Sequence, residues 1–353
     1  MRPIRTAAAS VVVAAPAPLQ VQASDDALLE VRDLRVQFPL DEGTVRAVDG
    51  LSYSLARGRT LGVVGESGCG KTITAQAILR IVPKPGRIVS GEIMYQPLGR
   101  APIDLAKVDP YGDTIRAIRG KEIAYIFQEP MASLSPVHTI GHQMVERVRL
   151  HMRVGGGEAR KRAVEMLERV GMPRPNQTID RYAHQLSGGQ RQRAVIAMAL
   201  VCRPSLLIAD EPTTALDVTT EAQILELLLE LQRDFGMAMQ YITHNLGVVA
   251  ELVDDVVVMY LGRPVEYGPV EDIFDAPGHP YTRALLRSIP KLGKKSRDRL
   301  ESIRGMVPDP YRVPAGCAYH PRCPLYQPGI CDEPRFEQIG PRHWALCNRA
   351  DAV

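Results

Sequence analysis

The segment 65–72 reads GESGCGKT and matches the pattern G-x-x-x-x-G-K-[ST] at every fixed position. A short apolar run of strand type, 60–64, precedes it, and apolar residues recur at helical spacing in the segment that follows, 72–80. Glycines let the main chain turn tightly, so successive N–H groups can point at phosphate oxygens, and a helix start adds unpaired N–H groups. A strand, a loop and a helix in this order predict a nucleotide site. The predicted phosphate-binding residues are Gly65, Glu66, Ser67, Gly68, Cys69, Gly70, Lys71 and Thr72.

Two of these residues have defined chemistry. Lys71 is expected to reach the β- and γ-phosphates of the nucleotide, and the Thr72 hydroxyl is expected to be a Mg²⁺ ligand. A second helix start follows the segment 186–190, LSGGQ, where Ser187 is a natural N-cap. This segment can bind an anion through a hydroxyl, main-chain N–H groups and a side-chain amide, which come from Ser187, Gly188, Gly189 and Gln190. The sequence thus predicts two helix starts that face phosphate.

Polar side chains follow three apolar runs of strand type. Asp210 and Glu211 end the run 205–209, Gln128 ends 123–127, and His244 ends 239–243. Ligands of open α/β sheets bind at the carboxyl ends of parallel strands. Asp210 is therefore expected to hold Mg²⁺, and Glu211 to polarise the attacking water as general base. Strands that alternate with helices predict an α/β fold, a mixed sheet of the P-loop type.

Length and charge limit the other possibilities. A chain of 353 residues can form one large domain and a smaller one, and a formal net charge of +3 does not indicate nucleic-acid binding. No apolar run is long enough to cross a bilayer. Residues 1–25 resemble a weak signal peptide, but we favour a disordered extension or a start codon assigned too early. The basic segment 291–299 is interpreted as a solvated linker.

The remaining features are less specific. Residues 28–38 alternate as an edge strand does, and Phe38 is a candidate either for stacking on a purine ring or for the core. Residues 139–150 and 157–170 have helical patterns and form an insert without strands. The tail after Gly305 is rich in proline and cysteine and shows little periodicity, so it needs a staple. Four cysteines crowd this tail and favour a metal site over disulfides: Cys317, Cys323, Cys331 and Cys347.

The motifs together resemble the ATPase domain of ABC transporters. GESGCGKT, Gln128, LSGGQ, LLIADE, ALD and His244 occur in the order of that family, and the resemblance covers residues 28–268. The block from YAHQLSGGQ to ILELL, together with ITHNLGVVAE and HPYTRALLRSIP, is similar to the oligopeptide/dipeptide importer branch and to its D-type subunit. The resemblance implies three parts: an extension 1–25, an ABC ATPase domain 26–268 with a helical subdomain at about 129–186, and a C-terminal extension 269–353.

The resemblance also implies a mechanism. Two ATPase domains pair head to tail, so that Ser187 and Gly189 act on the partner's ATP, while Lys71, Thr72, Gln128, Asp210, Glu211 and His244 act on this chain's own. His244 would contact the γ-phosphate and the attacking water. Gln128 would couple the metal and the nucleotide to the membrane subunits, and Asp217 would link the two sites.

The implied cofactors are ATP, Mg²⁺ and a [4Fe–4S] cluster on the four tail cysteines, with zinc as the alternative and His320 and His343 as further candidate ligands. The implied partners are an F-type second ATPase subunit, two transmembrane permeases and an extracytoplasmic solute-binding protein. The resemblance places the chain at the cytoplasmic face of the inner membrane as a peripheral subunit. The implied cargo is di- or oligopeptides, with oligosaccharides, nickel, opines or glutathione as alternatives. A soluble ABC ATPase of DNA repair or translation is the remote alternative.

Overall fold

The computed structural model describes residue 19 and residues 26–129, 133–214, 216–289 and 303–353. The linker predicted at 291–299 lies outside these ranges. So does the extension predicted at 1–25, apart from Leu19, which is buried in the hydrophobic core. Both predictions therefore stay predictions.

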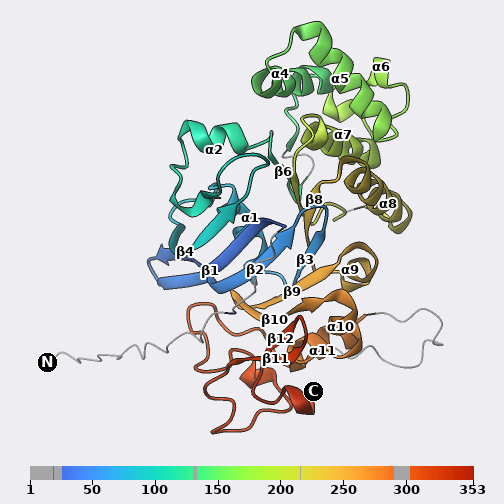
Figure 1. The fold of residues 1–353 in the computed structure, drawn as a ribbon. Coiled ribbons are helices and arrows are strands. Elements are labelled where there is room, and N and C mark those ends of the chain that lie inside the picture. Colours follow the sequence, from blue (N-terminus) through green and yellow to red (C-terminus); the bar gives the residue numbers. More distant parts are fainter. Residues whose placement is uncertain (1–18, 20–25, 130–132, 215, 290–302) are drawn as a thin grey trace, which may run out of the picture.

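The described residues form two sheets (Figure 1). The smaller is antiparallel, and its described strands run in the order β2-β1-β4-β5. β1 pairs on both edges, because Val31 lies opposite Tyr53 of β2 and opposite Ile93 of β4. The prediction of an edge strand at 28–38 is therefore wrong. The bounds are β1 Ala27–Leu40, β2 Gly43–Ala56, β4 Arg87–Tyr95 and β5 Ile103–Asp104.

The larger sheet carries the predicted nucleotide motifs. Among the described residues its order is β11-β12-β10-β9-β3-β8-β7-β6, with a parallel centre from β9 to β6 and antiparallel strands at the other side. The mixed α/β sheet is thus confirmed. The bounds are β3 Thr60–Val64, β6 Ile123–Ile126, β7 Leu206–Asp210, β8 Ala238–Thr243, β9 Asp255–Tyr260, β10 Arg263–Pro269, β11 Phe336–Gly340 and β12 His343–Leu346.

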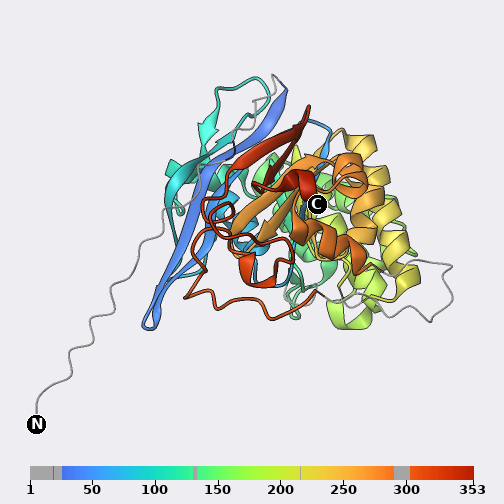
Figure 2. The same cartoon turned by 90° about the horizontal axis from the view of Figure 1, so that it is seen from below.

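The central strands are buried along their whole length and are largely apolar, because both faces of the sheet are covered. Alternate residues of a strand point to opposite faces. Leu206 and Ile208 of β7 belong to the cluster between the two sheets, whereas Leu207 and Ala209 belong to the cluster under the helices. Continuous apolar runs of this kind are typical of parallel strands buried on both sides. Figure 2 shows the long β1–β2 ribbon on one flank and the helices on the other.

The helices surround this sheet, and three of them form a separate lobe. Figure 1 shows α4, α5 and α6 above the sheet, with α7 leading from the lobe to the sheet, which agrees with the predicted helical insert. No described helix is both long enough and apolar enough to cross a membrane. The bounds are α1 Lys71–Ile78, α2 Asp113–Ile118, α4 Ile140–Met152, α5 Gly156–Arg169, α6 Pro175–Thr178, α7 Gly188–Leu200, α8 Val218–Phe235, α9 Leu246–Leu252, α10 Val270–Asp275 and α11 Pro280–Arg287. Short 3-10 turns are η1 Leu105–Lys107, η2 Ala183–Gln185, η3 His320–Arg322 and η4 Ala350–Ala352.

The C-terminal tail has more regular structure than its sequence indicates. β11 and β12 form a hairpin, and β12 pairs with β10, so that Ala345 lies opposite Glu266. The fully buried Glu266 carboxylate accepts hydrogen bonds from the N–H groups of Gly278 (2.6 Å) and His279 (2.9 Å), and it lies 2.7 Å from His343 Nε2. The tail is therefore anchored by sheet pairing and buried polar contacts, which the prediction of a tail held only by a staple missed.

Burial of His279 makes the stability of the folded protein depend on pH. Its Nδ1 accepts the Tyr281 N–H (3.1 Å) at the start of α11, and burial lowers the pKa of His279 to about 3. The unfolded chain binds a proton below about pH 6.5 that the folded protein excludes. We therefore expect protonation of His279 in the unfolded chain to lower the free energy of unfolding by about 1.4 kcal/mol for each pH unit between about 6.5 and about 3.

The measurement is denaturant unfolding of the wild type and of His279→Asn between pH 7 and about pH 5. Asparagine retains a capping side chain but does not titrate. The variant should be less stable at pH 7, and its deficit should shrink as the pH falls. A deficit that is the same at every pH would contradict this assignment.

Candidate nucleotide site

A cavity of about 220 Å³ lies at the carboxyl ends of the parallel strands, where the predicted phosphate loop follows β3. The residues that line it come from the loop, from β2, from the ends of other strands and from the C-terminal tail. They are Val45, Arg46, Ala47, Ser67, Gly68, Gly70, Lys71, Thr72, Ile73, Gln128, Glu211, Leu261, Gly262, Pro310 and Val313. The structure thus brings most of the predicted phosphate loop together with Gln128 and Glu211.

The loop has its shape because two glycines lie against other main chain. Gly65 and Gly70 have φ values of 150° and 103°. A Cβ at Gly65 would lie 2.2 Å from the Met259 carbonyl oxygen, and one at Gly70 would lie 2.1 Å from that of Ala47. Neither position can hold a side chain, because non-bonded atoms do not approach so closely. The packing of the loop against β2 and β9 therefore fixes the direction of its amides.

Lys71 is buried at the start of α1. Its ammonium donates to the carbonyl oxygens of Gly65 (2.8 Å) and Glu66 (3.1 Å). No side chain caps the start of α1, so the N–H groups of its first turn stay available beside the cavity. A buried positive charge and free N–H groups at one point form an anion site that suits a polyphosphate.

Oxygen ligands for a divalent cation meet beside the loop. The Thr72 hydroxyl donates to Asp210 Oδ1 (3.2 Å), and the Tyr125 hydroxyl donates to Asp210 Oδ2 (2.7 Å). Burial raises the pKa of Asp210, and the hydrogen bonds from Tyr125 and Thr72 partly offset the rise. Hard oxygen donors of this kind fit Mg²⁺, which the predicted Thr72 and Asp210 would hold.

Glu211 lies at the centre of the polar end of the sheet. Gln128 Nε2 donates to its Oε2 (2.9 Å), Thr214 Oγ1 donates to the same oxygen (3.2 Å), and His244 Nδ1 lies 3.0 Å from its Oε1. Burial raises the pKa of Glu211, but the hydrogen bond and charge of His244 and the charge of Lys71 outweigh burial, so the pKa lies below its usual range. Glu211 is therefore ionised at neutral pH and can accept a proton from water. Its φ of 46° is uncommon outside glycine and is typical of strained functional positions.

The LSGGQ segment lies outside this cavity. Ser187 is the N-cap of α7, as predicted, and forms a capping box with Gln190. Asp217 caps α8 through the Thr220 N–H (2.9 Å), and a Cβ at Gly189 would lie 3.1 Å from Thr220 Cγ2. The structure thus places the predicted Ser187, Gly188, Gly189, Gln190 and Asp217 together at a second, largely exposed site.

Phe38 is not brought to the cavity. It lies in β1 opposite Val45, is partly buried, and packs against the cluster between the sheets. A Cβ at Gly86 would lie 2.5 Å from the Phe38 ring, so the ring occupies the space beside that glycine. Phe38 thus has a partly buried packing position, and its neighbour Val45 in β2 lines the cavity. Stacking of Phe38 on a purine ring stays a prediction.

The four tail cysteines line one common cavity. Cys317, Cys323, Cys331 and Cys347 meet there with His320, whereas His343 is bonded to Glu266. Burial raises the pKa of Cys317 to about 12 and that of Cys347 to about 11, and the neighbouring cysteines add to both rises. Within the described residues, however, no three His, Cys, Asp or Glu side chains form a group that could hold a metal ion.

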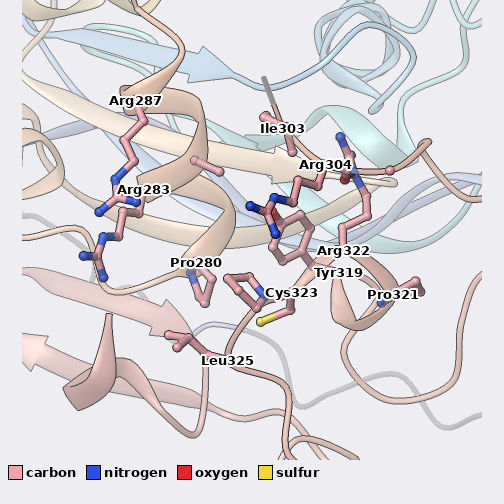
Figure 3. A pocket seen from close by; sticks show the side chains of 13 residues that line it. Pro280, Arg283, Arg287, Ile303, Arg304, Tyr319, Pro321, Arg322, Cys323 and Leu325 are labelled. Carbon is pink, nitrogen blue, oxygen red and sulfur yellow. Dashed lines mark hydrogen bonds between the residues drawn. The ribbon is translucent and has the colours of Figure 1, made fainter. Parts of the chain in front are cut away.

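A larger cavity than the candidate nucleotide cavity lies elsewhere among the described residues. It has a volume of about 1030 Å³ and lies between α11 and the tail, with Arg283, Arg287, Arg304 and Arg322 on its wall (Figure 3). No carboxylate and none of the predicted nucleotide-binding residues is among the described residues that line it. The smaller cavity, where phosphate, metal and base positions meet, is therefore the candidate site.

The sequence analysis missed residues that complete the site. The sequence identifies Tyr125 only as part of an apolar strand. Its buried hydroxyl needs a hydrogen-bond partner, however, and it donates to Asp210. That need is a signal that the sequence contains. Thr214 reaches Glu211 through a local turn, in which the Thr214 N–H donates to the Glu211 carbonyl oxygen (3.2 Å). Pro310 and Val313 reach the site through tertiary packing, and no local pattern in the sequence marks them.

Comparison with family models identifies two regions of the chain. The model described as "ABC transporter" matches residues 48–214, and the model described as "Oligopeptide/dipeptide transporter, C-terminal region" matches residues 265–331. The first region contains the phosphate loop, Gln128, LSGGQ and Glu211. The second contains α11 and three of the four tail cysteines.

Relatives and solved structures agree with these matches. The chain is 47% identical to the "Probable peptide ABC transporter ATP-binding protein" of Sinorhizobium fredii, over 95% of this chain and 98% of that protein. It is also 47% identical to the dipeptide transport ATP-binding protein DppD of Haemophilus influenzae, over 90% of this chain and 94% of that protein. A dimeric ATP-binding cassette solved with ADP and Pi is similar, with a TM-score of 0.59, 25% identity, and coverage of 69% of this chain and 98% of that one. So is the cbiO1 cassette of Clostridium perfringens, with a TM-score of 0.56, 30% identity, and coverage of 71% and 91%.

Tyr125→Phe tests the metal position. The variant keeps the ring, which lies 4.4 Å from that of Phe127, and removes only the hydroxyl that orients Asp210. We expect Mg²⁺ to bind about three- to tenfold more weakly in the presence of nucleotide, the effect of one hydrogen bond. Titration with Mn²⁺ as a paramagnetic probe measures this. The exposed Tyr111→Phe is the control, and equal Mn²⁺ affinity in the two variants would contradict the role of Tyr125.

Proposed function

The chain belongs to the ABC transporter ATP-binding proteins with an oligopeptide/dipeptide-type C-terminal region, and from this membership we propose its function. It is the ATP-binding and ATP-hydrolysing subunit that energises import of di- or oligopeptides. The observation that carries this function is the convergence of Lys71, Thr72, Gln128 and Glu211 on one cavity, in a chain related to peptide transport proteins along nearly its whole length.

Each residue of the site has a role in hydrolysis. Lys71 and the amides of the phosphate loop bind the phosphates, and Thr72, Asp210 and Gln128 would hold Mg²⁺, which supplies charge neutralisation for the phosphoryl group. The Glu211 carboxylate accepts a proton from the attacking water. His244, held beside Glu211 Oε1, orients the water and contacts the γ-phosphate.

The exposed LSGGQ segment supports pairing of two cassettes. Its residues lie outside this chain's own cavity, and the starts of α7 and α8 are open to a partner. Ser187 and Gly189 would bind the nucleotide of a second, F-type ATPase subunit, and Asp217 would link the two sites. ATP binding then favours the closed pair and hydrolysis releases it.

The remaining partners that we propose are the other subunits of a peptide importer. A peripheral ATPase requires transmembrane permeases, and the helical lobe of α4 to α6 is the surface on which they would dock. We propose two permeases, an extracytoplasmic solute-binding protein, and a position at the cytoplasmic face of the inner membrane. Gln128, which contacts Glu211 and precedes the lobe in the chain, would couple the nucleotide to the permeases.

Glu211→Gln tests the general base. The amide keeps the size and a hydrogen-bonding oxygen but cannot accept the proton of water, so ATP hydrolysis should fall by about a hundredfold or more. MgATP binding should be retained. Hydrolysis is measured by phosphate release and binding by calorimetry on the full chain. Glu230→Gln, on the exposed face of α8, is the matched control, and near-normal hydrolysis by Glu211→Gln would reassign the base.

The tail cysteines are proposed to hold a [4Fe–4S] cluster. Support comes from the common cavity that all four line and from the set of four thiols, which is the ligand set of such clusters. Burial keeps Cys317 and Cys347 protonated at neutral pH, as their raised pKa values indicate, so cluster binding would release protons. Zinc on the same cysteines is the alternative, and His320 in the same cavity is a further candidate ligand.

Anaerobic purification distinguishes these possibilities. A cluster predicts iron and acid-labile sulfide at about four each per chain, whereas a zinc site predicts one zinc and no sulfide. Cys331→Ser should lose the metal, and Cys202→Ser, which changes a buried cysteine of α7's C-terminal end, should retain it. Protein that contains neither iron nor zinc would overturn the proposed metal site.

A further inference from the structure

Two residues of the C-terminal region form hydrogen bonds with Glu66 of the phosphate loop. The Glu66 N–H donates to the Tyr281 hydroxyl (2.8 Å), and the Glu66 carboxylate accepts two parallel hydrogen bonds from Arg322, from Nη1 (2.8 Å) and Nη2 (3.1 Å). Tyr281 lies in α11, and Arg322 ends η3, 256 residues after Glu66. The main chain and the side chain of Glu66 are thus both bound by residues beyond the cassette itself.

The guanidinium that binds Glu66 is held rigidly. The Arg322 side chain is 3% exposed, and its Nε donates to the Arg304 carbonyl oxygen (3.0 Å). Its Cζ lies 5.8 Å from the ring centroids of both Tyr260 and Tyr319, which pack against each other and against Tyr281. Figure 3 shows Arg322 and Tyr319 side by side on the cavity wall, with Cys323 nearby. A planar guanidinium fixed on several sides is suited to bidentate recognition of a carboxylate.

Glu66 connects this clamp to the phosphates. The Glu66 carbonyl oxygen accepts hydrogen bonds from the Lys71 ammonium (3.1 Å) and from the Cys69 N–H (3.3 Å). Glu66 therefore binds the C-terminal region through its side chain and N–H, and the interior of the phosphate loop through its carbonyl oxygen. Displacement of Glu66 would therefore move the carbonyl that holds Lys71. It would also leave a carboxylate charge without its counter-ion close to the bound polyphosphate.

We propose that Arg322 and Tyr281 are positioning residues for ATP: they fix Glu66, and through it the phosphate loop, in the conformation that binds the nucleotide. This inference rests on the proposed function, since it assigns a further determinant of the same ATP site. A loop already held in its binding conformation loses less conformational entropy when the ligand arrives. The clamp therefore acts on affinity for MgATP and leaves the chemistry at Glu211 untouched.

A second ion pair between the tail and the cassette provides a matched control. Arg342, beside β12, donates from Nη2 to both oxygens of Asp255 in β9 (2.8 and 2.9 Å). Neither residue lines the nucleotide cavity. Loss of either arginine removes contacts between the tail and β9, since Arg322 also donates to the Tyr260 hydroxyl (3.4 Å), but only loss of Arg322 touches the phosphate loop.

The experiment measures MgATP binding by calorimetry, and KM and kcat for hydrolysis, with the full chain. Arg322→Ala should raise Kd and KM about tenfold, the effect of a lost charge-assisted pair, with kcat within about twofold of wild type. Arg322→Lys should recover only part of the affinity, because a lysine cannot form the bidentate pair. Tyr281→Phe, which removes only the acceptor for the Glu66 N–H, should raise Kd about threefold. Arg342→Ala should bind MgATP as the wild type does.

A double-mutant cycle separates positioning from general loss of stability. If Arg322 acts through Glu66, the effects of Glu66→Gln and Arg322→Ala on Kd are not additive, and the double variant should bind MgATP about as well as Arg322→Ala alone. Additive effects, or an Arg322→Ala variant with the affinity of Arg342→Ala, would overturn the proposal and leave the ATPase function standing. Wild-type protein that fails to bind MgATP would overturn both.

Discussion

The whole site depends on close contact between the phosphate loop and the main chain of β2 and β9. A Cβ at Gly65 or Gly70 would lie little more than 2 Å from a carbonyl oxygen, so the loop can adopt its conformation only without side chains there. The contact fixes the loop relative to the sheet. Because the neighbouring strands are parallel, their carboxyl ends bring Gln128, Asp210, Glu211 and His244 to the same edge. Phosphate, metal and water positions thus come from one packing constraint.

The different surroundings of the two adjacent carboxylates support the different roles that we propose for them. Asp210 is almost fully buried, and burial raises its pKa, while the Tyr125 and Thr72 hydroxyls direct its oxygens. Glu211 lies at the more exposed end, where His244 and Lys71 lower its pKa and keep it ionised. A buried, oriented carboxylate suits a cation that supplies the missing positive charge. An ionised carboxylate beside a histidine suits proton transfer from water. Environments that differ in this way assign the roles of neighbouring acids.

Local physics explains what the sequence could and could not predict. The strand–loop–helix order around the phosphate loop, the N-cap at Ser187 and the buried strand before Asp210 each depend on residues a few positions apart, and the structure agrees with each. The hairpin of β11 and β12 was missed because β11 is mostly polar and exposed and β12 is only four residues long. β12 is held by long-range pairing with β10, which no local pattern shows. Phe38 has two interpretations because an aromatic residue suits a core as well as a base, and its contact with Gly86 depends on tertiary packing that the sequence does not show. Arg322 was beyond local reasoning, since its partner lies 256 residues away.

The C-terminal region is therefore better understood as part of the ATP site than as an appended domain. It extends the main sheet through β12, and it contributes Pro310 and Val313 to the cavity wall. It also supplies the only ion pair to Glu66 found among the described residues. The turn that carries Arg322 lies between Cys317 and Cys323, so the residue that binds Glu66 adjoins a cysteine of the four-cysteine cavity. A cassette that lacked this region would keep every nucleotide motif and still have an incompletely held phosphate loop.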